Sequence, residues 1–191
     1  MKRVIIVHGW EGTPDEGWFP WLKKELESKG FDVLVPQLPD TMNPHIDTWV
    51  PALATAVGEV DADTYFVGHS MGCQTIARFL ATLPEGVQAG GAVFVAGFFQ
   101  HITGLTEEAD LVMDAEWHDT PLDLDVVRKH MRGSVAIFSD DDPYVALSNV
   151  EDFKDTLGSE IVVLPKHRHF SGSSGYLELP IVLEKVLELS R

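Results

Sequence analysis

Six short runs of apolar residues constrain the fold of this chain more strongly than any other feature of its sequence. The runs are continuous rather than alternating and are rich in β-branched residues, a pattern typical of strands buried on both faces of a parallel sheet. They occupy residues 4–7, 31–35, 65–67, 92–96, 135–138 and 161–164. We therefore predict a sheet of six strands.

The segments between these runs have the apolar spacing of amphipathic helices. They cover residues 18–29, 46–57, 71–83, 145–157 and 180–189. Gly30 stands where a glycine commonly ends a helix, and Pro180 is compatible with a first helical turn. Strands that alternate with helices predict an α/β fold. We expect a doubly wound, mostly parallel sheet in the order 2-1-3-4-5-6, with helices on both faces.

The length of 191 residues suits one domain with a sizeable core, and no repeat, low-complexity tract or linker divides the chain. We predict a single domain over residues 1–191. The N-terminus shows no signal peptide, no apolar run approaches the ~20 residues of a membrane span, and the single cysteine, Cys73, cannot form an internal disulfide. These features predict a soluble, cytoplasmic protein.

Acidic residues dominate the charge of the chain. Fourteen Lys and Arg against thirty Asp and Glu give a formal net charge of −16. A field of this sign repels phosphate backbones and anionic membrane surfaces. We expect no nucleic-acid partner, no membrane partner, and a small substrate that is neutral or cationic.

The sequence Gly68-His69-Ser70-Met71-Gly72 follows the predicted third strand directly and opens the third helix. A strand, a sharp turn with serine at its apex, and a helix form the context in which G-x-S-x-G is a nucleophile elbow. The turn lifts the serine hydroxyl clear of the sheet, and the glycines avoid clashes where strand and helix approach each other. Ser70 is the predicted nucleophile. We expect Cys73, one helical turn later, to be a small buried residue.

A serine nucleophile needs a general base and an orienting acid, which in this class of fold follow it in the order acid, then histidine. Three consecutive acids, Asp140, Asp141 and Asp142, follow the fifth strand, and His167 and His169 follow the sixth. Both groups stand at the carboxyl ends of strands, the edge where open α/β sheets assemble their sites. The proline after Asp142 favours that residue because it restrains its backbone. Loop reach favours His169 over His167 only weakly.

An oxyanion hole needs two backbone donors, one from the residue after the nucleophile and one from the loop after a neighbouring strand. Met71 supplies the first. The first strand runs into a glycine-flanked loop, residues 8–12, in which the N–H of Trp10 or of Glu11 is the second candidate, and we select Trp10. Strands 1 and 3 are neighbours in the predicted order, so Trp10 and Ser70 are expected to face each other across a crevice.

The motifs VHGWEG, GHSMG, SDDDPY and HRHF resemble those of the compact serine hydrolase family of the α/β-hydrolases, the group of YdeN and the retinoblastoma-binding-protein-type serine hydrolases. The resemblance spans nearly the whole chain and implies a trimmed α/β-hydrolase fold without a large cap. In that family the acid stands directly before proline and the base directly before phenylalanine, which implies Asp142 and His169 here. Arg168 departs from the family pattern, in which glycine commonly precedes the catalytic histidine.

The residues and the resemblance together predict a serine hydrolase that cleaves carboxylic esters or activated amides through an acyl-enzyme intermediate, without a cofactor or a metal. Carboxylesterase-like activity is expected first, and thioesterase or aminopeptidase activity would use the same chemistry. One alternative is a non-catalytic interaction module on a hydrolase scaffold. Another is a metal-dependent hydrolase using His167, His169 and residues 140–142, whose spacing matches no recognised metal motif.

Two further expectations concern the surroundings of the site. The aromatic residues that follow strand ends, Trp10, Phe98 and Phe99, are predicted to line an apolar acyl pocket for short-to-medium or aromatic acyl groups. Residues 100–125 carry eight acidic residues and no Lys or Arg. We expect a solvated, charge-rich connection there, and a small acidic flap over the site is the functional alternative.

Overall fold

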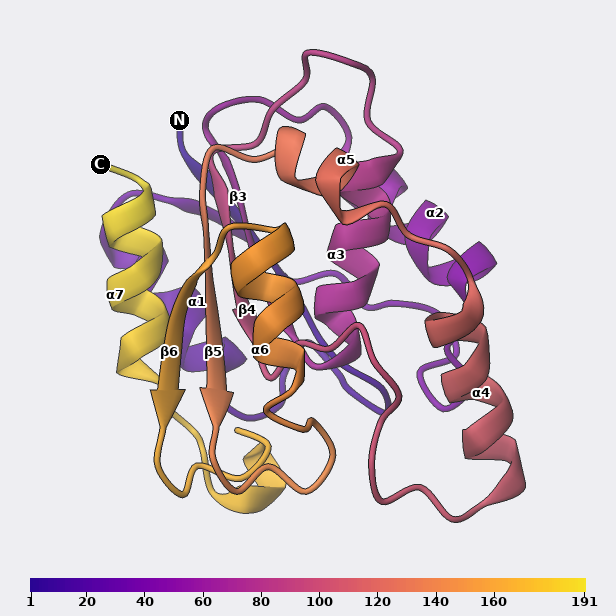
Figure 1. The fold of residues 1–191 in the computed structure, drawn as a ribbon. Coiled ribbons are helices and arrows are strands. Elements are labelled where there is room, and N and C mark those ends of the chain that lie inside the picture. The colour runs from indigo at the N-terminus through magenta and orange to yellow at the C-terminus, as the bar shows by residue number, and fades with distance from the viewer.

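A sheet of six strands forms the centre of the computed structural model, which describes residues 1–191 (Figure 1). The strands are β1 (Arg3–Val7), β2 (Asp32–Leu34), β3 (Thr64–His69), β4 (Gly91–Val95), β5 (Ser134–Ser139) and β6 (Glu160–Leu164). Their order is β2-β1-β3-β4-β5-β6, and every neighbouring pair is parallel. The predicted fold class and strand order are confirmed. β3 runs two residues beyond the predicted strand and ends immediately before Ser70.

Seven helices surround this sheet. They are α1 (Phe19–Ser28), α2 (Ile46–Val57), α3 (Met71–Ala81), α4 (Glu108–Asp119), α5 (Leu124–Lys129), α6 (Asn149–Glu151), which continues as a π-helical turn (Asp152–Thr156), and α7 (Pro180–Leu189). The helix predicted from residue 145 begins later, because the amides of Tyr144 and Val145 bond to the Asp142 side chain in a turn. None of the helices combines the length and apolar composition that crossing a membrane demands.

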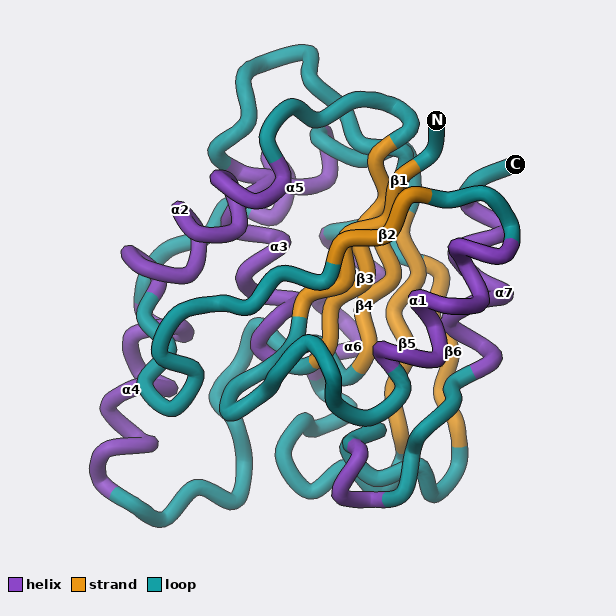
Figure 2. The backbone as a smooth tube through the Cα atoms, turned by 180° about the vertical axis from the view of Figure 1, so that it is seen from behind, coloured by secondary structure: helices purple, strands orange, loops and turns teal.

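Helices cover both faces of the sheet, which explains why its strands are continuously apolar. Figure 2 shows α1 and α7 together on one side and α2, α3 and α4 on the other. The first side holds a buried cluster that includes Trp18, Phe19 and Val182, and the second holds a larger one that includes Trp49 and Trp117. With both faces buried, each strand contributes apolar side chains in both directions.

The acidic segment between β4 and β5 is more ordered than its composition suggests. The prediction of a solvated connection over residues 100–125 is wrong in part, because this segment contains α4 and the beginning of α5. Met113 and Trp117 of α4 are buried against the core, while the acidic side chains lie mostly on the outer face. Only two of the twelve residues of α4 are large buried apolar anchors, too few for its sequence to display a clear apolar stripe.

Close packing between β1, β3 and α3 requires the glycines of the elbow. A Cβ on Gly72 would collide with the carbonyl oxygens of Val7 and His8, and one on Gly68 would lie 2.9 Å from the backbone of Cys73. Real Cβ atoms do not approach backbone so closely, so the chain needs glycine on either side of Ser70. This packing sets α3 directly behind the serine, with the first turn of the helix facing the carboxyl edge of the sheet.

Candidate active site

Ser70 stands at the sharp junction between β3 and α3. Its backbone has φ 53° and ψ −123°, a conformation that L-residues rarely adopt. The amide of Ser70 donates to the carbonyl of Val95 at the end of β4, which anchors the turn to the neighbouring strand. Strain of this kind costs roughly 1–3 kcal/mol per residue and persists where the surrounding structure enforces it. The junction has the geometry of a nucleophile elbow.

Ser70 and His169 line one cavity of about 380 Å³ at the carboxyl edge of the sheet. Five connections after strands contribute to its wall. The lining includes Trp10 and Glu11 after β1, Ile102, Leu105 and Asp110 after β4, Tyr144 and Val145 after β5, and Ser171 and Ser173 after β6. The cavity therefore lies where open parallel sheets generally form their sites.

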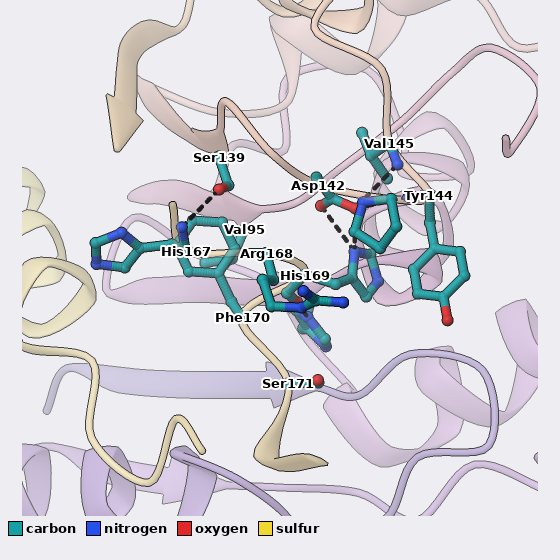
Figure 3. Close-up of polar contacts among 12 residues, drawn as sticks. Val95, Ser139, Asp142, Tyr144, Val145, His167, Arg168, His169, Phe170 and Ser171 are labelled. Carbon is teal, nitrogen blue, oxygen red and sulfur yellow. Dashed lines mark hydrogen bonds and ion pairs between the residues drawn. The ribbon is translucent and has the colours of Figure 1, made fainter. Parts of the chain in front are cut away.

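Asp142 holds the ring of His169 through a forked contact (Figure 3). His169 Nδ1 lies 2.8 Å from Oδ2 and 3.1 Å from Oδ1, and the side chains of Asp142 and His169 are 2% and 13% exposed. A proton on Nδ1 donated to this carboxylate leaves Nε2 as the acceptor. Nε2 makes no hydrogen bond to Ser70 Oγ in this structure, although both side chains line the same cavity. Such contacts are often long in the absence of substrate.

The two other aspartates of the triplet hold the backbone of the histidine loop. Asp140 Oδ1 accepts the amide of Lys166 at 2.7 Å, and Asp141 Oδ1 accepts the amide of Arg168 at 2.7 Å. Lys166, Arg168 and Phe170 all have positive φ values, so the loop is strained at alternate residues. Hydrogen bonds from Ser139 and from the Arg168 amide lower the pKa of Asp141. Asp140 and Asp141 thus each bind a backbone amide of the histidine loop, and Asp142 binds the ring of His169.

His167, the alternative base, faces away from Asp142. Its Nδ1 contacts the carbonyl of Pro165 at 2.8 Å and its ring stacks on Tyr176, while its amide bonds to Ser139 Oγ (Figure 3). It does not line the cavity with Ser70. The pairing of Asp142 with His169 is the one that the structure brings together. Arg168 is exposed and also lies outside the cavity wall.

The loop after β1 lies directly against Ser70. A Cβ on Gly9 would be 3.0 Å from Ser70 Cβ and 3.6 Å from Oγ, so a larger residue at this position would have to displace Ser70 by a few tenths of an ångström. The amide of Glu11 already donates to the carbonyl of Thr41 at 2.8 Å, which leaves Trp10 as the better candidate for the second oxyanion donor. Met71 is the first residue of α3, where amides have no partner within the helix. The oxyanion hole stays a prediction.

The predicted acyl pocket is wrong for two of its three residues. Trp10 lines the cavity, but Phe98 and Phe99 do not. Phe98 is buried in the core, and Phe99 packs on Phe153 with ring centroids 4.7 Å apart. The chain turns away from the cavity here because Asn149 Oδ1 accepts the amide of Phe99 at 2.8 Å. The apolar wall comes instead from Ile102, Leu105, Tyr144 and Val145.

The segment after β4 thus forms the outer wall of the cavity, and its role as a flap stays a prediction. It is attached to the body at both ends. The amide of Thr103 donates to the carbonyl of Tyr144, the Trp117 indole donates to the carbonyl of Pro44, and Glu116 contacts His45 at 2.6 Å. Cys73, in contrast, is fully buried with a pKa raised by burial, as expected for a structural thiol.

Two buried histidines support the loops around Ser70, and neither was identified from the sequence. His8 contacts the carbonyl of Gly9 through Nδ1 and accepts the amide of Leu38 at Nε2. His69 Nε2 donates to the carbonyl of His169 at 2.7 Å, which ties the elbow to the histidine loop. Burial lowers the pKa of both rings, that of His69 to about 3. Their positions inside the HG and GHSMG motifs were the available signal.

The low pKa of His69 predicts a loss of stability in acid. The unfolded chain binds a proton at His69 below about pH 6.5, whereas the folded chain does so only near pH 3, so stability is complete above pH 6.5 and falls between these values. His69→Gln keeps an N–H donor without a titrating ring. From pH 7.5 to pH 5.0 the variant should lose roughly 2 kcal/mol less unfolding free energy than the wild type, measured by urea denaturation. Equal losses of unfolding free energy in the two proteins would contradict the assignment of a low pKa to His69.

Comparisons with known proteins give matches over nearly the whole chain. A model of the family described as "Serine hydrolase" matches residues 4–188. The hydrolase YdeN of Bacillus subtilis (strain 168) is 30% identical over 183 residues, which cover 96% of this chain and 93% of that protein. The serine hydrolase RBBP9 of Rattus norvegicus is 23% identical over 188 residues, 97% of this chain and 95% of that protein.

Comparison with solved structures shows that the fold of this chain also occurs in known proteins. The crystal structure of the ydeN gene product from B. subtilis superposes with a TM-score of 0.90 at 28% identity, covering 99% of this chain and 98% of that one. Est1E from Butyrivibrio proteoclasticus, solved with ferulic acid bound, has a TM-score of 0.74 at 15% identity, covering 98% of this chain and 87% of that one. At that identity the second likeness concerns the fold alone.

Proposed function

The chain belongs to the serine hydrolase family, and from this premise we propose that Ser70, His169 and Asp142 form a triad that hydrolyses carboxylic esters or activated amides. One observation carries the proposal. The ring of His169 is held by the buried carboxylate of Asp142 and lines the same cavity as Ser70, which stands on a strained elbow. A nucleophile, a base and an orienting acid are the parts that acyl transfer requires.

The proposed reaction has two steps. His169 Nε2 takes the proton of Ser70 Oγ as the oxygen attacks the carbonyl carbon, and the amides of Met71 and Trp10 stabilise the oxyanion. His169 then gives the proton to the departing alcohol or amine, leaving an acyl ester on Ser70. In the second step, water loses a proton to His169 as it attacks the carbonyl carbon of this ester, and His169 returns the proton to Ser70 Oγ as the acid departs. Asp142 holds the ring and stabilises its charged form in both steps.

The cavity favours small acyl groups without negative charge. Its apolar wall suits short-to-medium or aromatic acyl chains, and two carboxylates, Glu11 and Asp110, lie on its lining without any Lys or Arg. The net charge of −16 adds a field of the same sign. We assign the protein to the carboxylesterase type (EC 3.1), with neutral or cationic esters preferred over anionic thioesters such as acyl-CoA and with aminoacyl amides as further candidates.

Three nitrophenyl esters of matched length, ending in an ammonium, a methyl or a carboxylate group, test this charge preference. The anionic ester should have a kcat/KM at least about tenfold below that of the cationic one, and 0.5 M salt should narrow the gap because exposed charges are screened over a few ångströms. Asp110→Asn and Glu11→Gln should also narrow the difference in kcat/KM between the anionic and the cationic ester. Fastest hydrolysis of the anionic ester would contradict the proposed specificity, and a preference for long lipid-like chains would contradict the proposed acyl size.

A further inference from the structure

Two histidines outside the catalytic cavity stack on each other at the two ends of the segment that forms its outer wall. His101 follows β4, and His118 lies in the last turn of α4. Their ring centroids are 3.6 Å apart, with the planes inclined by 26°. Asp119 lies beside them, and one ligand atom from each of the three side chains lies within 4.8 Å of the other two. All three residues are exposed, so a small solvated ion has access.

Carboxylates hold both rings in place. His101 Nδ1 lies 2.7 Å from Asp114 Oδ2, and the Asp114 side chain is only 4% exposed. His118 Nδ1 lies 2.8 Å from Asp119 Oδ1. A carboxylate at one ring nitrogen, as Asp114 is for His101, is the usual partner of a metal-binding histidine, because it fixes the tautomer and leaves the other nitrogen free to coordinate. Asp114 is therefore a buried group that orients an exposed ligand.

We propose that His101, His118 and Asp119 bind a divalent transition-metal ion of the Zn²⁺ type, with Asp114 orienting His101. Two imidazole nitrogens and one carboxylate oxygen suit Zn²⁺ better than Ca²⁺ or Mg²⁺, which prefer oxygen ligands throughout. Bonds of about 2.0–2.2 Å in a tetrahedral site place the ligand atoms about 3.3–3.6 Å from one another. Binding one ion would require the exposed side chains of His101 and His118 to rotate out of their stacked arrangement, because the nitrogen lone pairs lie in the ring planes. The acidic surface of the chain also attracts cations.

The ion would act on the shape of the cavity and take no part in the acyl chemistry. Asp114 also accepts the amide of Ile102 through Oδ1 at 3.0 Å, and Ile102 lines the cavity of Ser70. An ion shared by His101 and His118 joins the beginning of the wall segment to the end of α4. Metal binding thus holds the cavity wall in one arrangement. This role is independent of the proposed esterase activity.

Calorimetric titration of the tag-free protein with Zn²⁺ tests the proposal, and Co²⁺ gives a visible spectrum that reports nitrogen coordination. We expect one ion per chain. His101→Gln and His118→Gln should each weaken binding at least about tenfold, and Asp114→Asn about 10–100-fold. Zn²⁺ should raise the thermal midpoint of the wild type and not that of the two histidine variants, because only a ligand that binds the folded state stabilises it.

Two controls separate this site from others on the chain. His45 is also exposed and paired with a carboxylate, Glu116, but has no second imidazole beside it. His169→Ala removes the other histidine–aspartate pair that is able to attract Zn²⁺. His45→Gln and His169→Ala should each bind Zn²⁺ with the affinity of the wild type. Loss of binding in His169→Ala, unchanged binding in both His101→Gln and His118→Gln, or no saturable binding at all would overturn the proposal.

Discussion

Replacing Ser70 by alanine is expected to abolish labelling by a fluorophosphonate probe and to lower kcat for ester hydrolysis by roughly 10³–10⁶-fold. The hydroxyl is the only group that the proposed mechanism uses to form the acyl-enzyme, so no other side chain replaces it. Alanine carries the same Cβ as serine and therefore meets the same strain at φ 53°. The folded structure should change little, so the loss of activity should come from the missing hydroxyl and not from misfolding.

A matched control for this variant comes from the same cavity. Ser171 also lines it but does not stand on the elbow, so Ser171→Ala should be labelled and should turn over substrate nearly as the wild type does. Intact-mass spectrometry of the labelled proteins and their thermal midpoints check both results. Labelling that persists in Ser70→Ala would exclude Ser70 as the nucleophile. A folded wild type that neither reacts with the probe nor hydrolyses any ester would favour the non-catalytic alternative.

Asp142→Asn is expected to lower kcat by roughly 10⁴-fold, the loss known for the equivalent change in serine proteases. The amide oxygen of asparagine still accepts the Tyr144 and Val145 amides that Asp142 Oδ1 accepts now. The NH₂ group that replaces Oδ2 donates instead of accepting, which drives the His169 proton from Nδ1 to Nε2. Nε2 then has no free lone pair for the proton of Ser70. Asp142→Asn should therefore keep the turn that Asp142 forms with Tyr144 and Val145, while His169 can no longer act as the base.

The neighbouring aspartate supplies the comparison. Asp140→Asn keeps an oxygen for the Lys166 amide and touches no ring, so kcat should fall by less than about tenfold, the scale of one hydrogen bond. Steady-state kinetics on one ester, with circular dichroism to check folding, measures both variants. Equal losses at the two positions would mean that Asp142 acts only as a structural anchor, and the triad would need another acid.

The errors of the sequence-based predictions have a common physical origin. Phe98 and Phe99 follow a strand end, as pocket residues often do, but Asn149 from a distant helix directs the chain away from the cavity. α4 was not expected, because its apolar anchors, Met113 and Trp117, bury against segments far from it in the chain. In each case a contact between remote segments decides the outcome, and no local pattern records it.

The sequence by itself determined the local structure of this protein, which means the positions of most strands and helices and of the elbow. The alternation of buried strands and amphipathic helices predicts most of these elements, because apolar periodicity is a property of neighbouring residues. The strand order follows from the doubly wound arrangement that such an alternation usually adopts. The GHSMG motif predicts the elbow for the same reason, since the steric demand for glycine arises within five residues.

Only the tertiary structure decided how the candidate site is assembled. The spacing of residues left three aspartates and two histidines as candidates. The following proline favoured Asp142, loop reach favoured His169 only weakly, and the resemblance to a known family implied the same pair. Folding brings two strand-end loops together so that Asp140 and Asp141 bind backbone amides while Asp142 alone reaches an imidazole. The cavity wall likewise depends on a segment that packs against two other parts of the chain, one at residues 44–45 and one at Tyr144. The choice of acid and base and the choice of wall segment both depend on distances between segments that are far apart in the chain. Local sequence patterns do not record such distances, and the strained backbone of the histidine loop helps to set them.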